Sequence, residues 1–179
     1  KVFNLKQMAQ AMLFMQEHGI SGYEELHEKA SGFLKTQESL LESIKADEAH
    51  LQEIAVMKKH IVNYAKAKDV FAEYKASGYS QRFFEEHRDI LTLRRAAKEA
   101  FDGYKRVHGK DSKIPRVKEL SAEYAEILER KKRNYSDYRK LKKETKDWQV
   151  AEQIVSMIME DEKREKEISE KQMAYCDRQ

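Results

Sequence analysis

The chain has 179 residues, of which 37% are charged, and it holds only one proline and six glycines. This composition excludes a compact α/β enzyme with a thick core and favours long, solvated helices. A single cysteine, Cys176, excludes an internal disulfide, and the Cys and His spacing excludes a structural zinc site. The most apolar stretch, residues 8–15, is far too short to span a bilayer. We therefore expect a cytoplasmic protein without a membrane segment.

The N-terminal residues predict a short helix over residues 4–18. Asn4 is followed three residues later by Gln7, which is a capping-box pattern, and apolar residues then recur at helical spacing until Gly19. The chain opens with Lys1 rather than Met, and we expect it to be a fragment of a larger protein.

A very long second helix is predicted over residues 22–77. Ser21 and Glu24 form a second capping box at its start, and Gly78 suits the position just past its end. The apolar residues in between step by three and four, as in a coiled coil. They are Leu26, Ala30, Phe33, Leu40, Ile44, Leu51, Ile54, Ile61 and Ala65.

Two further helices complete the predicted set. Ser80 is suited to cap a medium-length helix over residues 80–107. Pro115 fixes a backbone angle compatible with the first turn of a fourth helix, which runs over residues 116–176 without a breaker. The fourth helix should match the second in length.

Two long amphipathic helices bury their apolar stripes most simply by folding back on each other. We expect an all-α fold in one helical domain over residues 1–179. It would be an elongated, coiled-coil-like antiparallel hairpin of two long helices with two shorter helices, in which Ile61 faces the region near Leu128. Because rods bury little surface per residue, we also expect a homodimer.

The sequence shows no catalytic or metal centre, and we expect no enzymatic activity, cofactor or metal in this segment. A Gly-rich phosphate loop and a Gly-x-Ser-x-Gly elbow are absent. Glu24 with His27 has the Glu-x-x-His spacing of di-iron bundles, but the fourth helix offers no matching pair on its apolar face. A solvated helix surface is the favoured interpretation of these residues.

Charge is separated along the chain. Residues 129–146 carry nine cations against three carboxylates, whereas residues 21–53 carry three cations against eight carboxylates. A basic helical stretch can hold nucleic-acid phosphates. The candidate nucleic-acid-binding residues are Arg130, Lys131, Lys132, Arg133, Arg139, Lys140, Lys142, Lys143 and Lys146.

Aromatic residues near this stretch have two interpretations. Tyr135, Tyr138 and Trp148 are of the type that stacks on exposed bases. Tyr138 and Trp148 also fall on the apolar spacing, which favours core positions, and basic runs are common on the solvent face of coiled coils. A phosphate-binding track and a solvated face both stay open.

A second candidate surface lies in the first helix. Met8, Met12, Phe14 and Met15 are apolar and mostly flexible, which suits an adaptable partner-binding surface. The alternative is that these side chains cover the open end of the hairpin.

Two strings in the sequence carry a family resemblance. The first starts at Lys58 and reads KKHIVNYAKAKDVFAEYKASGYSQRFFEEHRDILTLRRAAKEAFD, and the second starts at Ile114 and reads IPRVKELSAEYAEILERKKRNYSDYRKLKKE. The region from about His50 to Glu144 resembles the C-terminal helical region of relaxases. These are the mobilisation nucleases of Firmicutes conjugative transposons and mobilisable plasmids.

The resemblance implies a role in DNA transfer. Relaxases nick one DNA strand through a tyrosine nucleophile aided by a metal-binding histidine cluster, and this chain holds no clustered histidines, so the nuclease domain is expected outside it. The implied function is a non-catalytic accessory region in the bacterial cytoplasm, serving DNA positioning through non-specific phosphate contacts, or assembly with relaxosome or coupling proteins. The alternative is a structural coiled-coil module that homodimerises or docks a protein partner without DNA contact.

Overall fold

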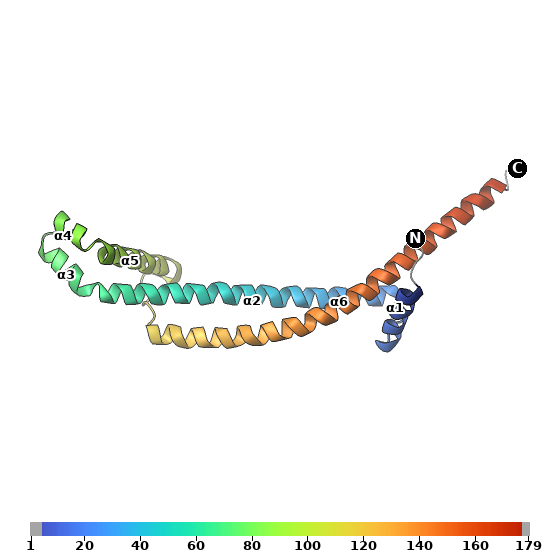
Figure 1. The fold of residues 1–179 in the computed structure, drawn as a ribbon, viewed down its shortest axis with the longest axis horizontal. Coiled ribbons are helices and arrows are strands. Elements are labelled where there is room, and N and C mark those ends of the chain that lie inside the picture. Colours follow the sequence, from blue (N-terminus) through green and yellow to red (C-terminus); the bar gives the residue numbers. More distant parts are fainter. Residues whose placement is uncertain (1–4, 177–179) are drawn as a thin grey trace. The chain divides into compact units, whose positions relative to one another are not determined.

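The computed structural model describes the backbone of residues 5–176 and the side chains of residues 5–173. Within this part of the chain there are six helices and no strand (Figure 1). The predicted all-α class is confirmed for these residues. Asn4, the predicted cap of the first helix, and the side chain of Cys176 lie outside them. The helices are α1 (Leu5–Glu17), α2 (Tyr23–Lys66), α3 (Lys68–Ala76), α4 (Gln81–Glu86), α5 (Arg88–His108) and α6 (Val117–Cys176).

Contacts divide the chain into two compact units. Unit 1 comprises residues 1–43 and 134–179, and unit 2 comprises residues 44–133. The division falls inside α2 and inside α6, so each long helix contributes to both units. The single helical domain expected from the sequence stays a prediction.

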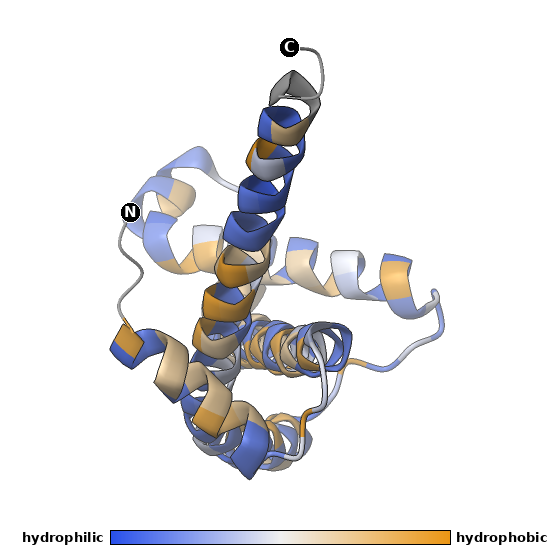
Figure 2. Cartoon of the chain, turned by 90° about the vertical axis from the view of Figure 1, so that its right-hand side faces the viewer, coloured by the Kyte–Doolittle hydropathy of each residue, from blue (hydrophilic) through white to orange (hydrophobic). Residues whose placement is uncertain are grey.

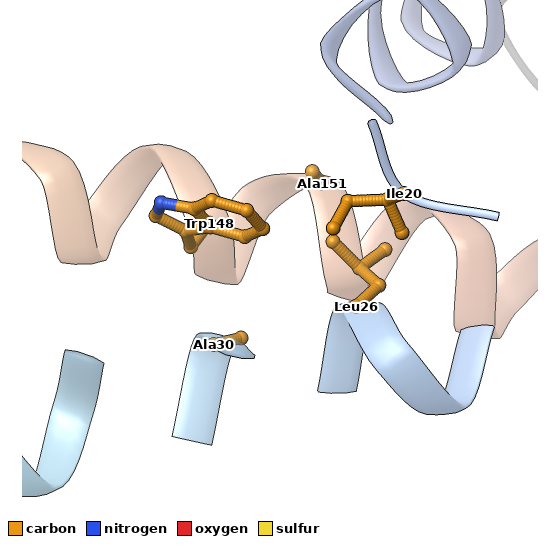
Figure 3. Close-up of a cluster of buried hydrophobic side chains, with 5 residues drawn as sticks. All are labelled: Ile20, Leu26, Ala30, Trp148 and Ala151. Carbon is orange, nitrogen blue, oxygen red and sulfur yellow. The ribbon is translucent and has the colours of Figure 1, made fainter. Parts of the chain in front are cut away.

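The core of unit 1 is built by the start of α2 and the later part of α6. Trp148 and Ala151 of α6 face Leu26 and Ala30 of α2, and Ile20 joins them from the segment before α2 (Figure 3). All five side chains are buried. Their three-and-four spacing in the sequence places them on one face of each helix, which is why these segments pack together.

The core of unit 2 joins the rest of α2 to the start of α6. Leu51 and Ile54 of α2 form a cluster with Leu120 and Ile127 of α6. The two segments are antiparallel, because Asp47 pairs with Arg130 and His50, further along α2, pairs with the earlier residue Glu123. This register differs from the one expected, in which Ile61 faced the region near Leu128: that region lies opposite the part of α2 near Asp47 and His50.

The predicted helix over residues 22–77 is broken at Ala67, into α2 and α3. Arg94 of α5 explains the break. Its guanidinium lies 3.9 Å from the centre of the Tyr64 ring and 4.1 Å from that of Phe71, and it donates a 3.2 Å hydrogen bond to the Tyr64 carbonyl. A side chain that occupies a helical carbonyl interrupts the backbone ladder.

The predicted helix over residues 80–107 is also two helices, α4 and α5, which meet at His87. The backbone of His87 leaves the helical region, with φ −119° and ψ 25°. Its ring packs 4.4 Å from that of Phe83, which anchors the bend. Ser80 stands at the N-cap of α4 but makes no capping hydrogen bond through its side chain, so its predicted capping role is wrong.

Helix ends follow the glycines as expected. Gly78, with φ +68°, follows α3, and the Tyr79 N–H donates to the Tyr74 carbonyl as in a Schellman motif. At the start of α2 the predicted Ser21–Glu24 box is replaced by Ser21 and Glu25. Both the backbone N–H and the hydroxyl of Ser21 donate to the Glu25 carboxylate at 3.0 Å, and these hydrogen bonds lower the pKa of Glu25.

The helices carry both polar and apolar residues rather than a uniformly apolar surface. In Figure 2 hydrophilic and hydrophobic residues alternate around the helix that leads to the C-terminus and around α1. In the part of the chain that the structure describes, no helix has both the length and the apolar character needed to cross a membrane.

Candidate functional site

The predicted basic residues all lie on α6, and three of the four in unit 2, Arg130, Lys131 and Lys132, are paired with carboxylates. The Nε of Arg130 donates to both carboxylate oxygens of Asp47 at 3.2 Å. Asp47 is buried, with 4% of its surface exposed. The hydrogen bond from Arg130 holds the pKa of Asp47 below its ordinary range, and the same bond raises the pKa of Arg130. This pair fastens α6 to α2.

Two neighbouring cations in unit 2 also pair with carboxylates. Lys131 lies 2.8 Å from Glu48 of α2, and Lys132 lies 2.7 Å from Glu129 on its own helix. Lys132, by its hydrogen bond, and the more distant charge of Arg133 lower the pKa of Glu129. These cations are therefore partly neutralised before any external anion is considered.

The basic residues in unit 1 are arranged differently. Arg139, Lys142, Lys143 and Lys146 recur at three- and four-residue intervals, so they share one face of α6, and all four are exposed. Tyr135, one turn earlier, lies on the same face with 44% of its surface exposed, and the Arg139 guanidinium lies 4.7 Å from its ring centre. We call these five residues the basic stripe.

Carboxylates leave most of the stripe unneutralised. Among the described residues no Asp or Glu oxygen lies within 4 Å of the ammonium groups of Lys142, Lys143 and Lys146. Lys140, which lies beside the stripe, is 3.8 Å from Asp137 on its own helix. The stripe from Arg139 to Lys146 is about 10 Å long at 1.5 Å per residue.

The opposite face of the same helical segment packs into the core of unit 1. Trp148 is 6% exposed and stacks on Phe33 of α2 with ring centres 5.3 Å apart. Tyr138 is half-buried. The core interpretation of Trp148 is therefore confirmed, and Tyr135 is the aromatic residue near the basic residues that lies exposed.

The four candidate partner-binding residues of α1 divide into two groups. Phe14 and Met15 pack against the core of unit 1, and the Phe14 ring meets Trp148 edge-on at 4.9 Å. Met8 is half-buried, whereas Met12 is 67% exposed. The neighbouring Leu13, which no sequence motif distinguishes, is 56% exposed.

A groove of about 440 Å³ lies between α1 and α6 within unit 1. Phe14, Trp148 and Ile154 supply apolar lining, and carboxylates from both helices also line it. Those carboxylates are Glu17, Glu144 and Asp147. The groove arises because α1 crosses α6 at Trp148, a tertiary feature that residue spacing within one helix does not reveal.

Two of the six histidines, His27 and His50, pair with carboxylates. The Nε2 of His50 lies 2.8 Å from Glu123 and its Nδ1 lies 3.3 Å from Glu53. Hydrogen bonds to these two carboxylates, Glu123 first, raise the pKa of His50. His27 pairs with Glu152 at 2.7 Å, which engages the histidine of the Glu-x-x-His spacing. Within the described residues no three His, Cys, Asp or Glu side chains are grouped to hold a metal ion.

Comparison with known proteins returned no match: no protein-family model, no curated protein and no solved structure is similar to this chain.

Proposed function

We propose that this chain is a non-catalytic helical region of a conjugative-transfer relaxase that positions DNA by contacting its phosphates in the bacterial cytoplasm. The basic stripe carries the DNA part of this proposal. It gathers four cations and one exposed aromatic ring on one face of a helix whose other face is packed. The two strings that resemble relaxases support the choice of parent protein, and they span the end of α2, helices α3 to α5 and the first half of α6.

The stripe suits a phosphate backbone rather than a particular base sequence. One DNA strand places a charge every 3.4 Å along the helix axis, so a stripe of about 10 Å matches roughly three phosphates. Lysine ammonium groups on flexible stems contact phosphates as point charges and read no base edges. Binding is therefore non-specific and falls steeply as salt is added.

In this proposal α2 and α6 form the two arms of an elongated, coiled-coil-like hairpin in a single domain. The antiparallel pairing of the two helices inside each unit supports it. The 60 residues of α6 would extend about 90 Å. Small-angle scattering should give a maximum dimension of at least this length, and a compact particle would contradict the hairpin.

The DNA proposal is tested by fluorescence anisotropy with labelled double-stranded DNA across a salt series. The test variant carries Lys142→Gln, Lys143→Gln and Lys146→Gln. Removing three phosphate contacts should lower the slope of log binding constant against log salt concentration by up to about 3. The matched control removes three exposed lysines later on the same helix, through Lys163→Gln, Lys166→Gln and Lys171→Gln.

Three outcomes separate the possibilities. Loss of affinity in the stripe variant alone supports the proposal. Equal loss in both variants would mean that only net charge matters, and absence of binding at low salt would contradict DNA contact altogether. In a full-length relaxase the stripe variant should still nick an origin oligonucleotide, because no chemical step is assigned to this segment.

Docking of a protein partner is the second candidate function. The exposed Met12 and Leu13 of α1 and the adjoining groove favour it, because exposed apolar residues beside a groove are typical of interaction surfaces. Calorimetric titration with a purified coupling ATPase tests it. Met12→Ser with Leu13→Ser should weaken binding, and Gln16→Ser, an exposed polar position of α1, should not.

A further inference from the structure

The end of α6 extends beyond the helix against which it packs in unit 1. Tyr23, the first residue of α2, donates a 3.4 Å hydrogen bond to Glu152 of α6. Since α2 and α6 are antiparallel here, the residues of α6 after about position 156 have no segment of α2 opposite them (Figure 1). Helices in proteins draw most of their stability from the packing of an apolar face, and α2 supplies no such packing to this segment.

This projecting segment exposes apolar side chains. Met157 is 41% exposed, Ile168 is 56% exposed and Met173 is 61% exposed. Met157 and Ile168 fall on one line of residues that steps by three and four, as a coiled-coil seam does. We call this line the α6 seam. Its residues are Met157, Asp161, Arg164 and Ile168.

The α6 seam is complementary to itself when a second copy runs in the opposite direction. Placing Met157 opposite Ile168 of the other copy also places Asp161 opposite Arg164. Two-fold symmetry repeats both contacts, because in such an interface each residue pair occurs twice. The result is a central block of two Asp–Arg pairs flanked on each side by a Met–Ile contact. A parallel arrangement would instead set Asp161 against Asp161 and Arg164 against Arg164.

Arg164 is free to change partners. In one chain its guanidinium lies 3.6 Å from Glu160 and 3.7 Å from Asp161, both on the same exposed helix. Exposed pairs of this kind contribute little, so exchanging the neighbouring carboxylate for the same carboxylate of a second copy costs little. Association with the second copy also removes Met157 and Ile168 from solvent.

We propose that this protein forms an antiparallel homodimer through the α6 seam, with Asp161 of each copy paired to Arg164 of the other. The dimer uses neither the basic stripe nor α1. It therefore stands independently of DNA contact, and loss of the dimer with DNA binding retained would leave the proposed function intact.

Analytical ultracentrifugation of the purified chain tests the dimer. The mass should approach twice the 21.2 kDa of one chain as concentration rises. Arg164→Asp places two carboxylates opposite each other at both central positions, and should raise the dissociation constant by at least about tenfold. Lys166→Asp makes the same change of charge on the opposite side of the helix and should leave the mass unchanged.

The charge swap fixes the direction of the helices. Combining Asp161→Arg with Arg164→Asp restores both opposite-charge pairs in the antiparallel arrangement, so the double variant should dimerise again. Failure of the double variant to recover, while circular dichroism shows it fully helical, would overturn the antiparallel seam. A monomer at all concentrations of the unaltered chain would overturn the dimer itself.

A matched pair of methionines tests the apolar contact. Met157→Ala should weaken the dimer, whereas Met159→Ala should not, because Met159 is similarly exposed at 38% but lies on the opposite face of α6. In a Cys176→Ser background, a chain with Met157→Cys should form a disulfide with a chain carrying Ile168→Cys. Disulfides between two Met157→Cys chains instead would indicate the parallel register and contradict the proposal.

Discussion

Asp47 of α2 and Arg130 of α6 form an ion pair in which the carboxylate is 4% exposed while the guanidinium reaches solvent. Three hydrogen bonds join the two groups: the Arg130 Nε donates to both carboxylate oxygens, and a terminal guanidinium nitrogen donates to one of them. Because Asp47 interrupts the apolar side of α2 near Ile44 and Leu51, its buried charge depends chiefly on this partner. A residue that looked like a candidate DNA contact therefore fastens two helices together.

Removal of the Asp47 carboxylate should destabilise the fold. Asp47→Ala eliminates hydrogen bonds to a charged donor and should lower the free energy of unfolding by about 2 kcal/mol. Glu48→Ala removes the neighbouring pair with Lys131, which is much more exposed, and should cost less than about 1 kcal/mol. Urea denaturation followed by circular dichroism measures both. Equal losses would show that burial of Asp47 adds nothing.

The same pair predicts a loss of stability in acid. Because the folded-state pKa of Asp47 is lowered from its ordinary value of 3.8, its contribution is complete above pH 3.8 and disappears as the pH falls through the lowered pKa. The free energy of unfolding should therefore fall less steeply below pH 4 in Asp47→Asn than in the unaltered chain. Parallel curves for the two proteins would contradict this assignment.

The contribution of His50 to stability depends on pH in the opposite direction. Its pKa is raised above the ordinary value of 6.5, so its pairs with Glu123 and Glu53 stabilise the fold fully below pH 6.5 and are lost as the pH rises through the raised pKa. The loss should be below about 1 kcal/mol, since the groups are about half exposed. His50→Gln should remove it. The control is His108→Gln, because the His108 ring of the unaltered chain donates to the Tyr104 carbonyl and not to a carboxylate. In this control the pH dependence that arises from His50 should persist.

Local pattern predicted the helices better than their interruptions. The glycine at position 78 marked a helix end from the sequence alone, because a positive φ favours glycine. The break at Ala67 has no such signal: it depends on Arg94, which is 30 residues away along the chain and reaches Tyr64 only after α5 has folded back. Spacing within one segment cannot reveal a side chain supplied by another.

The sequence predicted which residues form the candidate site but not which of them are paired with carboxylates. The nine basic residues could be located on one helix, but their division could not be foreseen. Which cations are neutralised depends on the register between α2 and α6, which brings Asp47 and Glu48 opposite Arg130 and Lys131. The expected register was wrong by more than ten residues, and an error of that size changes every cross-helix pair.

Two glycines with open surroundings should respond oppositely to alanine. A Cβ at Gly32 or at Gly78 would meet no atom within 4 Å, so the effect in each case is conformational. Gly32 lies inside α2, where alanine should stabilise the fold by up to about 1 kcal/mol. Gly78 has φ +68°, where alanine should cost about 1 kcal/mol. Thermal unfolding of both variants measures the pair, and a shift of the same sign in both would refute the argument.

Trp148 should be the most sensitive position of unit 1. Its ring lies within contact range of Phe14, His18 and Phe33, and so joins α1 and α2 to α6. Trp148→Ala should lower the free energy of unfolding by about 3 kcal/mol, because a large cavity would remain. Val150→Ala, two residues away and 46% exposed, should cost less than about 1 kcal/mol. Since Trp148 is the one tryptophan of the sequence, its emission should be shifted to shorter wavelength in the folded protein and should move to longer wavelength on denaturation. A native emission spectrum typical of a tryptophan in water would contradict this core.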